Sequence, residues 1–515
     1  MSLDRRATVD DLCRIAHGEC TIRLVPAAAE RIIASHLCVR RIIEERRHVY
    51  GLTTGFGPLA NRMIPTEEGI ELQQNLIYHL ATGLGPRLDW RSARAVLAAR
   101  LMSILQGASG ASLECVELMV AVLNAGFAPI IPEQGTVGAS GDLTPLAHVA
   151  LSLQGKSGFI DSANVELPAS AVFEVIGCGP LDLRRRDGLA LVNGTAAMTG
   201  IAALNTAAMD RAVKWSLALS AGMGDVMSAR TEAWSAEFSD LRPHPGQVRA
   251  ASLLRERSLG SSRMHHELIA SRQMPPNYAA VEETAGQDAY TLRCVPQIVG
   301  ACIDTTSWHR SIVETELTSA TDNPIFPENA TRPALHGGNF MGQHVALASD
   351  ALANAIIVLA GLAERQVARL TDERLNNGLP AFLAGAPSGL HSGFMGAQVT
   401  ATAVLAELRS NAGAASVQSI STNGANQDVV SMGTISARKC ASHLQETNQI
   451  QSILALCVAQ AVDIIPDPER CSPATLALHA RIREHVPVLV EDRSLSKDIQ
   501  KFGRAISAED PPATP

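Results

Sequence analysis

Residues 346–370 read ALASDALANAIIVLAGLAERQVARL and give the clearest structural signal in the chain. The polar interruptions are few, chiefly Asp350, Glu364 and Arg369. A helix that is apolar around its whole circumference is buried among other helices. Apolar residues recur at helical spacing from Asp187 almost to the C-terminus, which favours a long bundle of nearly antiparallel helices. The sequence therefore predicts an all-α protein.

The composition of the 515-residue chain supports a large helical core and excludes several classes of protein. Hydrophobic residues make up 46% and aromatic residues only 3%, which excludes wholesale disorder and favours helix over sheet. With 43 Lys and Arg against 51 Asp and Glu, the formal net charge is −8, which is not the basic balance of a nucleic-acid-binding protein. The ten cysteines form no CxxC pair, so we expect reduced thiols that are mostly buried.

We expect two parts in the chain. Residues 1–195 form an N-terminal domain with Gly-rich loops, and residues 196–515 form a central helical bundle and a C-terminal helical layer. No apolar segment of signal-peptide length stands at the N-terminus. The apolar stretches near residues 351–363 and 453–465 are too short or too interrupted to span a bilayer, so we expect a cytoplasmic protein without a membrane partner.

Two common cofactor signals fail on inspection. Residues 55–60, GFGPLA, fit the GxGxxG/A pattern, but a charged, helix-like run precedes them and Pro58 lies inside the turn. A dinucleotide site needs a strand before the glycines and a helix directly after them. The histidines show no metal-ligand spacing beyond the adjacent pair His265 and His266. We therefore expect neither a metal nor an external cofactor.

The segment with the most chemical information is residues 135–147, GTVGASGDLTPLA. Small residues at Ala139, Ser140 and Gly141 allow the backbone to fold tightly on itself. If the Gly141 nitrogen bonds to the Ala139 carbonyl carbon, loss of two waters, one of them from the Ser140 hydroxyl, gives an electrophilic imidazolone with an exocyclic methylene. The alternative is an ordinary turn in which Asp142 caps the next helix. The tripeptide alone does not separate the two, because a second Ala-Ser-Gly stands at residues 108–110.

The longer context resembles the aromatic amino acid ammonia-lyase family, whose members carry an autocatalytic methylidene-imidazolone (MIO) group. The resemblance covers nearly the whole chain, and its motifs come in the family's order. They are YGLTTGFGPLA at 50–60, VGASGDLTPLAH at 137–148, LVNGT at 191–195, QDAYTLRCVPQ at 287–297, TDNP at 321–324, HGGNF at 336–340 and ANQDVVSMG at 425–433.

The resemblance implies a role for residues at each matching motif. Ala139, Ser140 and Gly141 would form the MIO group, with Asp142 supporting ring formation. Tyr50 stands where the family keeps the base that removes the β-proton. Further residues match a second catalytic tyrosine (Tyr290), the carboxylate clamp (Arg293), groups that hold the MIO oxygen or the substrate (Asn193 and Gln287) and other substrate-binding positions (Gly57, His79, Leu80, Leu143, Asn323, Phe340, Asn426 and Gln427).

The pair His79-Leu80 falls at the family's selectivity position. Tyrosine-using members resemble His-Leu there, phenylalanine-using members Phe-Leu and histidine-using members Ser-His. An imidazole facing the ring's far edge can bond a phenolic hydroxyl, whereas a core histidine with a structural partner is the alternative. Histidine-using members resemble Glu where Gln427 stands, which argues mildly against a histidine substrate.

The resemblance thus implies non-oxidative conversion of L-tyrosine to ammonia and trans-p-coumarate, a phenylpropanoid. It also implies a homotetramer whose active sites are each built from three chains, in keeping with the many nearly all-apolar helices. Three alternatives stay open. They are a tyrosine 2,3-aminomutase with the same motifs, an ammonia-lyase that prefers phenylalanine or histidine, and a non-catalytic relative with the same fold.

Overall fold

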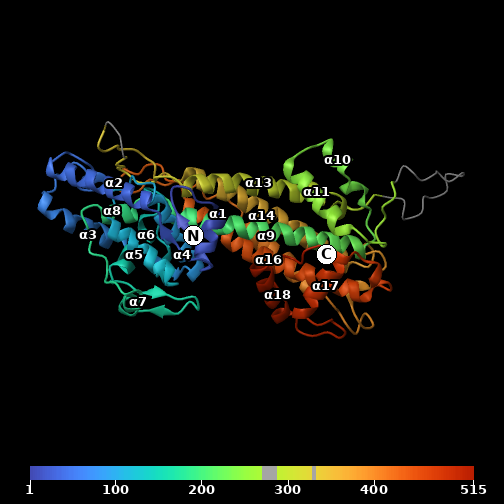
Figure 1. Ribbon diagram of the computed structural model, residues 1–515. Coiled ribbons are helices and arrows are strands. Elements are labelled where there is room, and N and C mark those ends of the chain that lie inside the picture. The colour runs from blue at the N-terminus through green and yellow to red at the C-terminus, as the bar shows by residue number, and fades with distance from the viewer. Residues whose placement is uncertain (269–286, 328–331, 515) are drawn as a thin grey trace, which may run out of the picture. The chain divides into compact units, whose positions relative to one another are not determined.

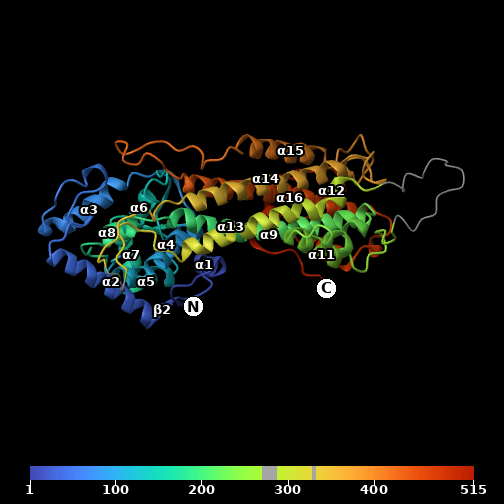
Figure 2. The same cartoon turned by 90° about the horizontal axis from the view of Figure 1, so that it is seen from above.

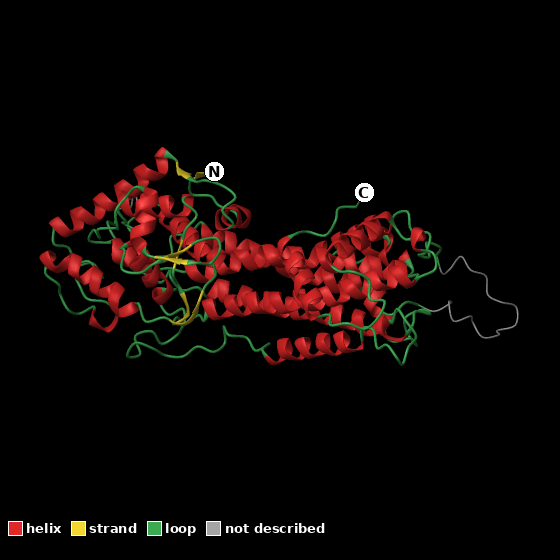
Figure 3. Cartoon of the chain, turned by 90° about the horizontal axis from the view of Figure 1, so that it is seen from below, coloured by secondary structure: helices red, strands yellow, loops and turns green. Residues whose placement is uncertain are grey.

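The computed structural model describes residues 1–268, 287–327 and 332–514. Helices dominate these residues and the strands are short (Figures 1 and 3), which confirms the predicted all-α class. The chain divides into two compact units. The first contains Met1–Ala207, Trp308–Asp350 and Ala414–Ala441, and the second contains Ala208–Ser307, Ala351–Gly413 and Ser442–Pro515.

The units do not follow sequence order. The predicted boundary at residue 195 falls near the end of the first segment, and two later segments of the chain join the same first unit. Of the five points at which the chain passes from one unit to the other, one lies outside the helices, between Gly413 and Ala414, and the other four lie in long helices. These helices are α9 (Ala196–Val226), α13 (Val295–Leu317), α14 (Gln343–Thr371) and α16 (Gly433–Ile464).

Side-chain caps mark the start of three helices of the first unit. Thr8 forms a capping box with Asp11, while Asp89 and Ser112 each accept a backbone N–H of the helix that follows. The shorter helices of this unit are α1 (Val9–Ala16), α2 (Pro26–Glu44), α3 (Gly69–Leu80), α4 (Trp90–Ile104), α5 (Leu113–Asn124), α6 (Leu143–Leu153), α7 (Ala169–Ile176) and α8 (Asp187–Val192).

The strands of the first unit form three small sheets. The parallel pair is β1 (Ser2–Leu3) with β2 (Arg23–Leu24), and the antiparallel three-stranded sheet contains β4 (Ala128–Pro129), β6 (Phe159–Ile160) and β7 (Glu166–Leu167). The antiparallel pair is β3 (Leu84–Arg87) with β5 (Pro132–Gln134). This last pair matters for the site, because β3 follows α3 closely and β5 ends directly before the Gly-rich segment.

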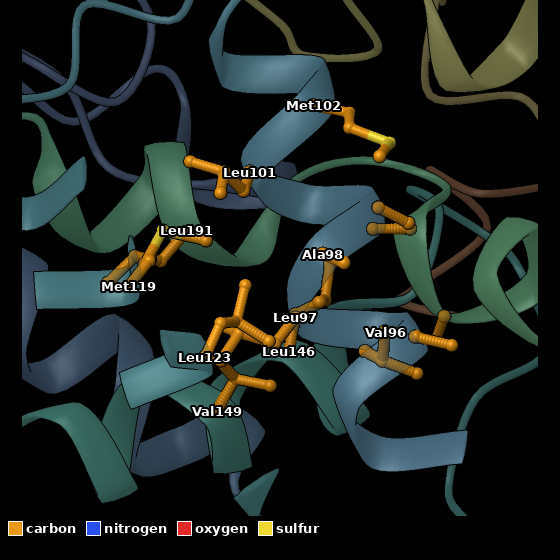
Figure 4. Packing of buried hydrophobic residues seen from close by; sticks show 14 of the residues in the cluster. Val96, Leu97, Ala98, Leu101, Met102, Met119, Leu123, Leu146, Val149 and Leu191 are labelled. Atoms are coloured by element: carbon orange, nitrogen blue, oxygen red, sulfur yellow. The ribbon is translucent and has the colours of Figure 1, made fainter. Parts of the chain in front are cut away.

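The core of the first unit lies around α4, which is buried over nearly its whole length. Figure 4 shows Val96, Leu97 and Leu101 of α4 among side chains of α5, α6 and α8, including Leu123 and Leu146. Close packing of these short helices fixes the start of α6 and the end of α8. The loop before α6 and the loop after α8 both contain predicted site residues.

The second unit is a helical bundle with its own core. Figures 1 and 2 both show α9, α14 and α16 alongside one another, and their apolar residues share one cluster with those of α15. Its other helices are α10 (Ala236–Asp240), α11 (Pro245–Ser258), α12 (Tyr290–Arg293), α15 (Met395–Ser410), α17 (Pro473–His485) and α18 (Ser496–Ala508).

Only α14, among the residues that the structure describes, is long and apolar enough to cross a membrane by length and composition. Most of its apolar window, 67%, is buried inside the protein, as in the core helix of a bundle. All ten cysteines are free thiols and six of them are buried, which confirms that expectation.

Candidate active site

The Ala139-Ser140-Gly141 tripeptide lies in the loop between β5 and α6. Gly138 and Gly141 both have left-handed backbones, with φ of 73° and 70°. The backbones of Ala139 and Gly141 pair with each other, and Gly141 also pairs with Gly194. A Cβ at Gly141 would collide with the Gly194 carbonyl, so only glycine fits this bend. The loop is therefore tightly bent at the tripeptide.

Hydrogen bonds from distant segments hold Ser140 and the residue that follows the tripeptide, Asp142. The Asn193 amide donates to the Ser140 carbonyl over 3.1 Å, and the Gln427 amide donates to the Ser140 hydroxyl oxygen over 3.2 Å. The Asp142 N–H donates to the Gly194 carbonyl over 2.8 Å. Donors thus reach both oxygens of Ser140, in keeping with the expectation that an MIO group forms here.

Asp142 is fully buried directly after the tripeptide. It occupies the N-cap position of α6, but its carboxylate makes no bond to that helix, so the simple capping interpretation is wrong. Instead one carboxylate oxygen accepts the Met198 N–H in the first turn of α9 over 2.8 Å, and the other accepts the hydroxyl of Thr434 at the start of α16. The carboxylate therefore links the starts of two other helices, where helix dipoles favour negative charge.

The environment of Asp142 changes its proton affinity. Burial raises the pKa of its carboxyl to about 6, although the bonds from Thr434 and Met198 act in the opposite direction. A neighbouring carboxyl, that of Glu316, also raises the pKa of Asp142. Glu316 itself accepts the Thr195 hydroxyl over 2.6 Å, and burial raises its pKa as well. The sequence had not indicated Glu316 as a neighbour of the site.

A cavity of about 1140 Å³ opens over the tripeptide, and every residue that lines it belongs to the first unit. It is large enough for a small aromatic amino acid. Many predicted site residues meet here. They are Tyr50, Gly57, His79, Leu80, Ala139, Ser140, Leu143, Asn193, Asn323, Phe340, Asn426 and Gln427.

Tyr50 lies on the loop after α2. Its phenol oxygen accepts the Gly57 N–H over 2.9 Å, and its ring meets Phe56 edge-on at a centroid distance of 6.1 Å. Gly57 has a left-handed backbone, and a Cβ there would lie 2.6 Å from the amide nitrogen of Asn423. The loop is therefore tightly folded around the phenol.

His79 lies in the last turn of α3 and faces the cavity. Its Nδ1 lies 3.0 Å from the backbone carbonyl of Asn75, one turn earlier. A carbonyl can only accept, so we assign the ring proton to Nδ1, which leaves Nε2 as an acceptor. The ring is exposed in this unit rather than buried in a core, so the core-histidine alternative is wrong.

Asn193 and Asn323 are tied to each other. The Asn323 N–H donates to the Asn193 side-chain oxygen over 2.6 Å, which leaves the Asn193 amide nitrogen to donate to Ser140. The Asn323 side-chain oxygen in turn accepts the Gly337 N–H over 2.8 Å. The orientation of the Asn193 amide is therefore fixed by its acceptor and its donor.

A buried ion pair beneath these asparagines was not predicted. Arg100 of α4 bonds to Asp322 over 2.8 Å, and both side chains are fully buried. Arg100 also donates to the Ala190 carbonyl of α8. The available signal was the presence of arginines, Arg94 and Arg100, among the apolar residues of α4. Other lining residues that the sequence analysis did not single out include Arg62, Asn75, Asn423 and Met341.

Gln287, Tyr290 and Arg293 belong to the second unit and do not line the cavity. Tyr290 is 67% exposed. The Arg293 guanidinium lies over its ring at 4.7 Å from the centroid, and the backbone carbonyl of Leu292 accepts the Trp234 indole N–H. The structure thus brings twelve of the predicted site residues together around one cavity, with Gly141 in the same loop as Ser140, whereas Gln287, Tyr290 and Arg293 belong to the other unit.

Comparison with known proteins agrees with this geometry. Residues 7–484 match the family described as aromatic amino acid lyase. The chain belongs to the aromatic amino acid lyase family. It is therefore an enzyme, a lyase of aromatic amino acids.

Individual members of the lyase family resemble the chain over almost its whole length. A tyrosine ammonia-lyase of Cereibacter sphaeroides is 52% identical over 99% of this chain and 98% of that protein. A histidine ammonia-lyase of Gloeobacter violaceus is 40% identical over 96% of this chain and 93% of its own length. The crystal structure of a tyrosine aminomutase from Streptomyces globisporus has a TM-score of 0.93 at 36% identity, covering 98% of this chain and 96% of that one.

Among the described residues of this lyase, no group of three or more His, Cys, Asp and Glu side chains is placed to hold a metal ion. The lining of the cavity carries several side-chain amides, one phenol, one imidazole, the Ser140 hydroxyl, the Arg62 guanidinium and the Asp428 carboxylate. These are groups that orient an organic substrate.

Proposed function

We propose that this lyase converts L-tyrosine to trans-p-coumarate and ammonia. The observation that carries the proposal is the His79 imidazole, which faces the cavity with Nε2 as an acceptor for a phenolic hydroxyl. The 52% identity to a tyrosine ammonia-lyase supports the same substrate. A site built to pair a substrate hydroxyl rejects an analogue without one, because the polar partner is then left unpaired.

Gln427 supports an uncharged substrate ring. Its amide donates to the Ser140 hydroxyl oxygen and its oxygen accepts the Thr422 hydroxyl over 3.0 Å. Both ends of the amide are thus used in positioning the loop. A neutral amide adds no charge that would select a cationic imidazole ring.

The electrophile in this proposal is an MIO group made from Ala139, Ser140 and Gly141. The paired backbones of Ala139 and Gly141, and the donors on both Ser140 oxygens, fit its formation. Asn193 and Gln427 would hold it. The group supplies an electrophilic methylene that makes the substrate's ammonium a better leaving group.

Tyr50 is the proposed base. In the net reaction the Cβ–H and Cα–N bonds break, a Cα=Cβ double bond forms, and the β-proton passes to Tyr50 while ammonia departs. The Gly57 N–H on the phenol oxygen stabilises the negative charge that the base carries before it takes the proton. Leu80, Leu143 and Phe340 provide apolar contacts for the ring.

We further propose that Gln287, Tyr290 and Arg293 act on the cavity of another copy of the chain in a homotetramer. The exposure of Tyr290 and its stacking with Arg293 support this role. A planar guanidinium binds a carboxylate through two parallel hydrogen bonds, which would orient the amino acid. The free cysteines favour a reducing compartment, so we place the enzyme in the cytoplasm.

A competition assay tests the substrate. Purified enzyme receives equal L-tyrosine, L-phenylalanine and L-histidine, and chromatography resolves the arylacrylates, urocanate and β-amino acids. Predominant p-coumarate is the expected result. Predominant β-tyrosine would make the enzyme an aminomutase with the same site, and predominant cinnamate or urocanate would contradict the role given to His79.

The substitution His79→Phe tests the same point at one residue. It removes the acceptor for the phenol, so the ratio of kcat/KM for tyrosine over phenylalanine is expected to fall by about tenfold to a hundredfold. Tyr78→Phe is the matched control, because Tyr78 is the preceding residue and is half exposed outside the cavity lining. An unchanged tyrosine preference in His79→Phe would refute the selectivity argument.

A further inference from the structure

We propose that Gln73 is a positioning residue that holds the Tyr50 loop at a fixed place relative to Asn193 and the tripeptide. The proposal rests on the proposed function, since it concerns the geometry of that reaction. Gln73 is fully buried in α3 and does not line the cavity. Its side chain acts through the groups that it joins.

The Gln73 amide joins two segments of the site. Its Nε2 donates to the Gly51 carbonyl over 3.0 Å, and Gly51 directly follows Tyr50. Its Oε1 accepts the Leu189 N–H over 2.8 Å. One partner can only accept and the other can only donate, so the amide has a single allowed orientation. Gln73 thus forms one bridge from the proposed base to α8.

Helix α8 carries this bridge to the tripeptide. Leu189 lies in the first turn of α8, where backbone N–H groups have no partner within the helix. No side chain caps this helix from its own N-cap position. The Leu189 carbonyl accepts the N–H of Asn193, whose amide donates to the Ser140 carbonyl. Three hydrogen bonds in succession therefore connect Gln73 to the tripeptide, through Leu189 and Asn193. The bond from Gln73 to Gly51 connects the same side chain to the Tyr50 loop.

The segments around Gln73 are closely packed. A Cβ at Gly188 would lie 2.9 Å from both the Cβ and the carbonyl oxygen of Gln73, so α8 approaches α3 at a glycine. A Cβ at Gly51 would lie 2.7 Å from the Leu189 side chain, and Gly51 has a φ of 66°. The Tyr50 loop, α3 and α8 meet at these two glycines with the Gln73 amide between them.

Loss of the amide has a specific consequence. An apolar side chain would leave the buried Gly51 carbonyl and Leu189 N–H unpaired, and both segments would shift to find new partners. Small displacements between a base and its reacting centre reduce the chemical step far more than substrate binding. The effect should therefore appear in kcat rather than in KM.

The test compares Gln73→Met with Gln74→Met. Gln74 is the matched control, because it has the same side chain on the same helix but bonds to Gln154 and Lys156, away from Tyr50 and α8. We expect Gln73→Met to lower kcat for tyrosine about tenfold to a hundredfold while KM changes less than about threefold. Gln74→Met should keep kcat within about twofold of the parent enzyme.

Two results would overturn the proposal. One is a kcat of Gln73→Met within about twofold of the parent, and the other is a loss of kcat no larger than that in Gln74→Met. Peptide mass across the tripeptide, measured in each variant, separates slower turnover from failure to lose two waters. Slower turnover and failure of the tripeptide to lose two waters would each support the positioning role of Gln73, provided that the tripeptide of Gln74→Met is modified normally.

A second variant keeps the test decisive if Gln73→Met does not fold. In Gln73→Glu, a protonated carboxyl can donate to Gly51 and accept from Leu189, whereas the ionised form cannot donate. Activity relative to the parent should therefore rise as the pH falls, and a flat ratio would overturn the proposal. Charged or titratable groups on or beside the packed elements are Tyr50, Glu67, Glu68, Glu71, Tyr78, His79, His148, Arg185, Arg186 and Asp187, all of which the parent enzyme shares.

The parent enzyme, assayed in parallel, separates the two proposals. If the parent makes no p-coumarate from tyrosine, the proposed function fails. The kcat of Gln73→Met is then compared with that of the parent for the product that the parent does make. If the parent is active and the variant is unaffected, only the positioning role of Gln73 fails.

Discussion

At the scale of residues, Ser140 is held by side-chain hydrogen bonds to both of its oxygens. Its carbonyl and hydroxyl oxygens accept from different side chains, Asn193 and Gln427, that lie far apart in the sequence. The residue is thus held in one position before any reaction takes place.

Ser140→Ala is expected to abolish turnover without unfolding the protein. Alanine has no hydroxyl to lose, so the tripeptide would keep its unmodified mass and kcat would fall by more than about a thousandfold. Circular dichroism should stay unchanged, because the loop is half-buried and the substitution removes a single atom. An Ser140→Ala enzyme with near-normal activity would exclude the tripeptide as the electrophile.

Asp142 gives a pH-dependent prediction. Its folded pKa is raised to about 6, above an ordinary unfolded value near 4, so the folded state binds the proton more tightly. Its contribution favours folding below about pH 4 and is lost as pH rises through about 6. The free energy of unfolding of the parent minus that of Asp142→Asn should therefore fall by about 2 kcal/mol from pH 4 to pH 7.

Denaturant titrations of both proteins at several pH values would measure this difference. Taking the difference removes the contributions of other groups, such as buried His309, whose pKa is lowered to about 4 by burial. A difference that rises with pH would show that the folded state prefers the ionised carboxylate.

Much of the residue-level site was predictable, because the motif residues match a family pattern. His79, Tyr50 and Gln427 were expected at the substrate and lie around one cavity. Gln73, Glu316 and the Arg100–Asp322 pair were not expected. Each acts through backbone groups or through another side chain, and a contact of that kind leaves no periodicity or spacing in the sequence.

At the scale of elements, the turn from Asn193 to Thr195 between α8 and α9 is a closely packed part of the site. Gly194 has a φ of 153°, and a Cβ there would collide with Arg100 and lie 2.5 Å from the Thr321 hydroxyl. The same glycine presents its carbonyl to Asp142. The buried ion pair and the tripeptide therefore meet at this turn from opposite sides.

Gly194→Ala is expected to destabilise the protein by about 1–3 kcal/mol and to prevent modification of the tripeptide, because the turn must move away from Arg100. Gly126→Ala is the matched control, since Gly126 also has a left-handed φ, 84°, but nothing lies within 4 Å of its Cβ position. Thermal melts and peptide masses of both variants make the comparison. Equal effects in the two would show that backbone conformation alone matters.

Helices were predictable as elements because apolar spacing and caps mark them, as at residues 346–370 and at Thr8. The bonding partners of a residue at a helix start were less predictable. Asp142 stands at the start of α6 but bonds to α9 and α16, because those helix starts are brought next to it only by tertiary packing.

At the scale of the whole molecule, the predicted split at residue 195 reflects sequence order, whereas the first unit contains three separated segments. Sequence periodicity shows where helices lie but not which of them pack together. The later segments, Trp308–Asp350 and Ala414–Ala441, bring Asn323 and Gln427 to a cavity begun by the N-terminal part.

A mixing experiment tests whether other copies of the chain complete the cavity. Tyr50→Phe and Arg293→Ala should each be inactive alone, since each lacks one proposed part of the site. Co-expressed in mixed tetramers, they should recover about a quarter of the parent activity, because random assembly pairs an intact Tyr50 with an intact Arg293 in that fraction of sites. Mixed oligomers without recovered activity would place both residues in a site of one chain.

The contacts from Gln427 to Ser140 and from Thr434 to Asp142 also set an order in time. Both come from the last segment of the first unit, which leaves the ribosome almost three hundred residues after the tripeptide. A nascent chain that has not yet reached this segment lacks the groups that hold Ser140 and Asp142. If the tripeptide forms the proposed electrophile, we expect it to mature only late in biosynthesis, and a polypeptide that ends before this segment should keep the unmodified tripeptide.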